Sequence, residues 1–83
     1  MIINFGDILK DQTGEVMERG QNAHFLILGN SIPNEDEQKI GERYQIMEIG
    51  VEGQPMGPIV FMDAYKLSQL KYVANLPKLV WSL

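Results

Sequence analysis

AHFLIL, residues 23–28, is a short continuous apolar run that ends at Gly29 and Asn30. A run of this length, bounded by turn residues, is typical of a strand that is buried on both faces. Residues 44–49 alternate with a period of two, which predicts a second strand whose more apolar face, Gln45, Met47 and Ile49, points inward. Two more strands are predicted, one around residues 8–9 and a buried one at residues 59–62.

The C-terminal part of the sequence indicates a helical element and a last strand. Asp63 can cap a first helical turn. The apolar residues behind it recur at helical spacing: Leu67, Leu70, Val73 and Ala74. Pro77 ends that element, and residues 79–81 are expected to form an edge strand. We therefore predict one mainly β domain over residues 1–83, a small barrel of four to six short strands with one short helix or 3₁₀ turn near the C-terminus.

Composition restricts the function. The chain has 83 residues, and its 7 Lys+Arg against 11 Asp+Glu give a net charge of -4, so bulk attraction to nucleic-acid phosphates is not expected. The absence of cysteine excludes disulfides, thiolate metal ligands and cysteine nucleophiles. No apolar run is long enough to span a membrane and no signal peptide is evident, so we expect a cytoplasmic protein without a membrane partner. A domain this short is marginally stable alone, which favours a homodimer.

His24 is the only histidine of the chain. It can act as a general base or contact a nucleic acid. Alternatively, it lies at the mouth of a strand and its ring forms a hydrogen bond with a backbone partner. We favour this structural interpretation. One histidine without cysteine makes a metal site improbable. Gly14, Gly20 and Gly29 lack the lysine and hydroxyl residue that follow a phosphate-binding loop, so we expect no cofactor.

Several other residues are candidates for binding. Glu35, Asp36 and Glu37 can hold a cation or mimic phosphates toward a basic partner, but their spacing differs from that of a calcium loop and a solvated loop is favoured. Tyr44 and Trp81 can stack on bases or form an interface, although burial accounts for most aromatic residues in a chain of this kind. Trp81 lies near the chain end, where another segment or subunit would have to cover it.

A series of features follows in a fixed order along the chain. They are Met1-Ile2-Ile3 with Gly6-Asp7-Ile8, the run 25–28 with Asn30, the predicted strands at 46–49 and 59–62, and a helical step at 68–70. In this order they resemble the MazF/PemK-type toxin family, whose members are SH3-like barrels that dimerise and cut RNA. The resemblance implies an SH3-like barrel and a homodimer.

The sequence departs from that family at its catalytic positions. Where the family has an Arg-Pro pair with a catalytic arginine, this chain has Ala23 and His24, and where the family places a catalytic hydroxyl residue it has Gly50. The family's C-terminal helix has no counterpart before Leu83. Because RNA cleavage needs a positioned cation, cleavage by the family mechanism is not expected.

The leading hypothesis is a non-catalytic interaction or regulatory module that binds another protein of unknown identity. Such a module can be an inhibitor of a basic or nucleic-acid-processing partner. A diverged ribonuclease is the first alternative, with His24 as the base and Arg19 or Arg43 stabilising charge, so enzymatic activity stays open. It requires His24 and an arginine to converge on one cleft. A nucleic-acid-binding barrel is the second alternative. It requires exposed aromatic residues beside a basic stripe drawn from Lys10, Arg19, Lys66 and Lys71.

Overall fold

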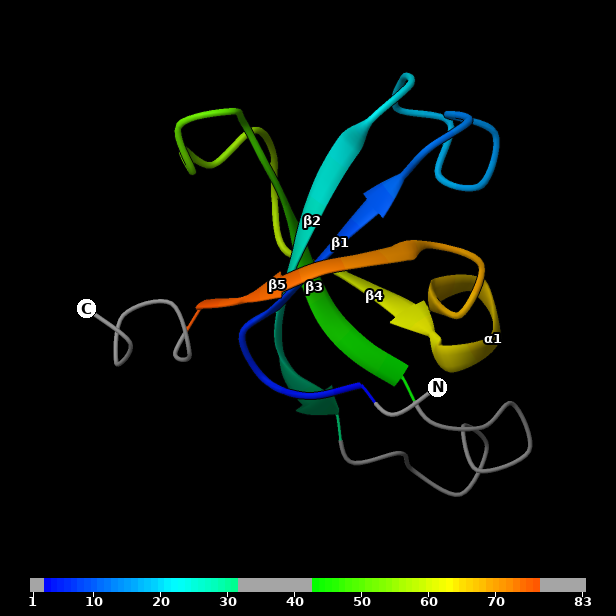
Figure 1. The fold of residues 1–83 in the computed structure, drawn as a ribbon. Coiled ribbons are helices and arrows are strands. Elements are labelled where there is room, and N and C mark those ends of the chain that lie inside the picture. The colour runs from blue at the N-terminus through cyan, green and yellow to red at the C-terminus, as the bar shows by residue number, and fades with distance from the viewer. Residues whose placement is uncertain (1–2, 32–42, 77–83) are drawn as a thin grey trace.

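The computed structural model describes residues 3–31 and 43–76 (Figure 1). Its elements are β1 (Asp7–Asp11), β2 (Ala23–Ser31), β3 (Arg43–Ile49), β4 (Val60–Asp63), α1 (Ala64–Leu67) and β5 (Lys71–Asn75). The strands form one antiparallel sheet in the order β4-β3-β2-β1-β5. The predicted mainly β fold with one short helix near the C-terminus is therefore confirmed. In the described part of the chain β4 and β5 are the sheet edges, so the sheet is not closed into a barrel.

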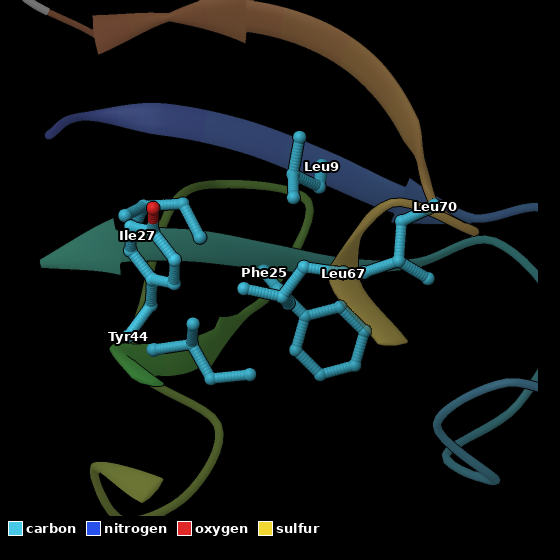
Figure 2. Packing of buried hydrophobic residues seen from close by; sticks show 7 residues of the cluster. Leu9, Phe25, Ile27, Tyr44, Leu67 and Leu70 are labelled. Atoms are coloured by element: carbon cyan, nitrogen blue, oxygen red, sulfur yellow. The ribbon is translucent and has the colours of Figure 1, made fainter. Parts of the chain in front are cut away.

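One side of the sheet, which we call the inner face, carries the hydrophobic core (Figure 2). Side chains alternate between faces along a strand, and every second residue of β1, β2 and β3 points to this side. The helix and the turn after it add two leucines. The buried members are Leu9, Phe25, Ile27, Tyr44, Ile46, Leu67 and Leu70. The other side of the sheet is the outer face.

The predicted inward face of β3 is wrong. Tyr44 and Ile46 are buried, whereas Gln45, Met47 and Ile49 are only partly buried. The apolar count favoured the second set, but pairing decides the face: Ile46 lies directly opposite Ile27, which belongs to the inner row of β2.

Strand β2 is correctly placed but is buried on one face only. Phe25 and Ile27 are buried, while Leu26 and Leu28 lie on the outer side and are partly exposed. The strand also continues past the predicted end to Ser31, because a register shift between Ile27 and Gly29 lets the backbone stay paired with β3.

The helix is present but is shorter than the periodicity predicted. Its cap is as expected: Asp63 Oδ1 accepts a hydrogen bond from the Lys66 amide at 2.7 Å. The helix ends at Leu67, and Val73 and Ala74 belong to β5 instead, where Ala74 pairs with Ile8 of β1. Pairing with the open edge of β1 satisfies backbone groups that a longer helix would leave unpaired there. The edge strand expected at residues 79–81 lies outside the described residues.

Strand β4 is where a buried strand was predicted, but its first two residues are exposed and Met62 is only partly buried. Val60 is 41% exposed and Phe61 53%, and Ile59 just before the strand is 54% exposed. The reason is position: β4 pairs with β3 on one side, and in the described structure no strand pairs with its other side. An apolar run therefore lies at the surface.

The connection between β1 and β2 is organised by one buried carboxylate. Asp11, only 1% exposed, accepts hydrogen bonds from the Gly14 amide at 3.1 Å and from the Met17 amide at 2.8 Å. Val16 and Met17 of this connection pack against the core. The loop is thus held against the core by its own hydrogen bonds and apolar contacts.

Gly14 and Gly53 offer a matched test of this loop. Both have a left-handed backbone, with φ of +80° and +81°, but an added Cβ at Gly14 would lie 2.7 Å from the Gln21 backbone nitrogen, whereas at Gly53 it would meet nothing within 4 Å. We expect Gly53→Ala to lower the free energy of unfolding by about 1–2 kcal/mol from strain alone. Gly14→Ala should cost at least about 1 kcal/mol more because of the overlap. Urea denaturation measures both, and equal losses would contradict the close packing of this loop.

Candidate functional site

His24 lies on the outer face of β2, and its Nδ1 is 2.8 Å from the Asn22 carbonyl oxygen. A carbonyl oxygen only accepts, so Nδ1 carries the hydrogen and donates it. The backbone partner that was expected for His24 is therefore present.

Arg19 and Arg43 do not converge with His24. Arg19 donates from Nε to Glu48 Oε1 at 2.8 Å. Glu48 lies opposite Phe25 and so belongs to the inner face, whereas His24 belongs to the outer face.

Arg43 is at the other end of β3. His24 lies opposite Ile49, and Arg43 is six residues further along the strand, about 20 Å away. The cleft that the ribonuclease alternative requires is therefore not formed by His24 with either arginine.

The candidate binding residues separate into two groups. Tyr44 is in the core and is 7% exposed, with its ring among the buried side chains of Figure 2. Glu35, Asp36, Glu37 and Trp81 lie outside the described residues.

An open groove lies beside β4 on the inner-face side. Its volume is about 260 Å³, and its apolar wall is formed by Met17, Phe25, Val60 and Met62. Gly57, Pro58 and the Arg19–Glu48 ion pair complete the lining. Elements far apart in sequence build it: the connection after β1, the inner rows of β2 and β3, and β4.

The groove continues into an exposed apolar edge, which we call the β4 edge: Met56, Ile59, Val60 and Phe61. Each of the four is more than 40% exposed. An edge strand presents unpaired backbone amides and carbonyls, and natural edges are normally protected by lysine, proline or a bulge. Strand β4, with the sequence VFMD, has no lysine or proline, and its pairing with β3 has no register shift. Its protection is limited to its length of four residues and to the charge of Asp63 at its end.

The groove is lined mainly by apolar side chains, with one ion pair in its wall. Its lining contains neither a histidine nor a serine or threonine hydroxyl, and the charges of Arg19 and Glu48 neutralise each other. Across residues 3–31 and 43–76 there is no group of three or more His, Cys, Asp or Glu side chains that could hold a metal ion. In the same residues no helix has the length and hydrophobicity needed to cross a membrane.

The chain matches no family model, no curated protein and no solved structure. The resemblance to the MazF/PemK-type family thus stays a prediction from the residues.

Sequence reasoning missed the β4 edge. The signal was present in residues 56–62, whose apolar side chains are interrupted by Gly57 and Pro58 and followed by a helix cap at Asp63. A strand that is interrupted by glycine and proline and ends at a helix cap is short, and a short strand is typical of a sheet edge. Whether it lies at an edge depends on the order of strands in the sheet, which the sequence does not show.

Proposed function

We propose that this chain is a non-catalytic, SH3-like interaction module that binds an extended apolar segment of another polypeptide along the β4 edge. The observation that carries the proposal is an apolar edge strand, with no strand paired to its far side among residues 3–31 and 43–76, next to an apolar groove. An extended peptide that pairs with a sheet edge obtains affinity from backbone hydrogen bonds and specificity from pockets for alternate side chains.

The geometry of β4 and the groove supports an apolar partner segment. Val60 and Met62 lie opposite Ile46 and Tyr44, so both belong to the inner-face row and both line the groove. A partner strand beside β4 would direct every second side chain to this same side. Because Arg19 and Glu48 neutralise each other in the groove wall, these partner side chains are expected to be apolar and uncharged.

The partner class can be tested with displayed peptides. A library of linear random 12-residue peptides, selected on the full chain, should enrich sequences with apolar residues at alternate positions. Val60→Lys should weaken the selected peptides at least about tenfold, the effect of losing a central apolar contact. Isothermal titration calorimetry gives the dissociation constants.

Val51→Lys is the matched control. It places the same charge at a valine that is 99% exposed and lies in the connection before β4, outside the groove. Melting curves of both variants establish that they fold. Equal binding by wild type and Val60→Lys, with both folded, would refute the proposal.

A second copy of this chain is the other polypeptide that can pair with β4. Light scattering at micromolar concentration distinguishes this outcome: a dimer that Val60→Lys converts to a monomer would make the partner segment β4 itself. The dimer that the sequence predicted through Trp81, and inhibition of a basic partner through residues 35–37, stay predictions because those residues are outside the described structure.

A further inference from the structure

The outer face carries a row of three basic side chains, which we call the basic row: His24 on β2, Lys10 on β1 and Lys71 on β5. Lys10 lies directly opposite His24 on one side and directly opposite Lys71 on the other. Residues directly opposite in antiparallel strands point to the same face. Since neighbouring strands are about 4.8 Å apart, the row extends about 10 Å across the sheet.

The two lysines have no carboxylate partner in the described structure. In residues 3–31 and 43–76 neither Lys10 nor Lys71 forms an ion pair. The acidic residues of β1 are on the inner face: Asp7 accepts from Asn75 Nδ2 at 2.8 Å, and Asp11 holds the loop after β1. Like charges directly opposite each other in a sheet are destabilising, so the Lys10–Lys71 pair does not stabilise the fold.

An apolar pocket lies on the same face next to the basic row. Its volume is about 380 Å³, His24 is in its wall, and Ile8, Ile49, Val73 and Ala74 supply apolar surface. Ile8 is two residues from Lys10 on the same side of β1, so the pocket lies alongside the basic row in the strand direction.

We propose that the outer face binds a polypeptide segment in which an apolar side chain is flanked by carboxylates. The apolar side chain occupies the pocket, and the carboxylates lie over Lys10 and Lys71. Charge complementarity selects an anion, and the pocket selects an apolar group next to it.

The positions of the aromatic residues, away from the two lysines, favour a polypeptide ligand over a single-stranded nucleic acid. Binding of single strands relies on aromatic rings beside the cations, on which bases stack. The pocket wall contains no phenylalanine, tyrosine or tryptophan, and its one aromatic ring is the His24 imidazole. Tyr72 of β5 lies opposite Leu9, which places it on the inner-face side. The net charge of -4 also weakens the attraction of a polyanionic strand.

The probe is a capped pentapeptide with a central leucine and glutamate at the other four positions, compared with the same peptide carrying glutamine at those positions. In an NMR titration of the full chain, the glutamate peptide should shift the amides of Ile8, Lys10, His24 and Lys71. The glutamine peptide should bind at least about threefold weaker, as expected for losing exposed ion pairs. Added salt should weaken only the glutamate peptide.

Lys71→Glu separates binding from stability. It replaces a repulsive cross-strand pair with an attractive one, so the melting temperature should rise by roughly 1–5 °C while affinity for the glutamate peptide falls at least about tenfold. Lys66→Glu on α1 makes the same change of charge outside the basic row and should leave the affinity within about twofold of wild type.

Three results would overturn the proposal. They are unchanged binding by Lys71→Glu, shifts that map to the β4 edge instead of the basic row, and tighter binding of an eight-residue oligothymidylate than of the glutamate peptide at the same amides. The site is separate from the β4 edge, so Val60→Lys should leave this titration unchanged, and either surface can fail without the other.

Discussion

Replacing Ile46 with alanine should lower the free energy of unfolding by about 2–5 kcal/mol. Ile46 is fully buried, and it packs opposite Ile27, which is also fully buried, at the centre of the inner face. A chain of 83 residues has a total stability of about 4–12 kcal/mol. The variant should therefore lose a large part of its stability, which urea denaturation monitored by circular dichroism will measure.

The neighbouring residue of β3 is the control. Met47 lies on the outer face opposite Leu26 and is only partly buried, so Met47→Ala should lose no more than about 1.5 kcal/mol. Ile46→Val, which removes one methylene group, should lose about 0.5–1.5 kcal/mol. A larger loss for Met47→Ala than for Ile46→Ala would mean that β3 faces the other way, as its apolar pattern alone suggests.

Replacing Asp11 with alanine should have the second largest effect, a loss of about 2–4 kcal/mol. Its buried carboxylate accepts two backbone hydrogen bonds. Hydrogen bonds to charged groups contribute about 1.5–3 kcal/mol each, and these two are expected at the lower end because they are only partly buried. Without it the Gly14 and Met17 amides lose their acceptor. Hydrogen exchange of these two amides, together with urea denaturation, checks both the local and the global result.

Two controls distinguish this role from a general charge effect. Asp11→Asn keeps one carbonyl oxygen and should lose less than Asp11→Ala. Glu15→Ala removes an exposed acid of the same loop and should change stability by no more than about 0.5 kcal/mol. If Glu15→Ala and Asp11→Ala lost the same amount, the carboxylate would not be what organises the loop.

Local signals predicted the parts of the fold that depend on local structure. The apolar run at 23–28 is β2, residues 8–9 lie in β1, and Asp63 caps a short helix as its side chain and position indicated. These features depend on burial of a few neighbours or on one hydrogen bond within a turn.

Pairing between strands that are distant in sequence determined which face of β3 points inward and where the helix ends. The inward face of β3 follows from its register with β2, and Val73 and Ala74 joined β5 because β1 had an open edge. Both outcomes depend on contacts between residues far apart in the chain. A helical spacing of four apolar residues cannot reveal them.

The candidate sites divide in the same way. The backbone partner of His24 is two residues away and was expected, whereas the separation of His24 from Arg19 and Arg43 depends on strand faces and register. The β4 edge and the basic row also depend on strand order. Lys10 and Lys71 are 61 positions apart in sequence, and only the pairing of β1 with β5 places them opposite each other.

Amide hydrogen exchange of residues 60–63 tests the central claim most directly. In the free chain the amides of β4 that point away from β3 have no partner strand in the described structure and should exchange rapidly. With a selected apolar peptide bound, these amides should become protected, while those of Val51 and Glu52 keep their rates. Protection confined to Lys10, His24 and Lys71, with no change in β4, would contradict the account.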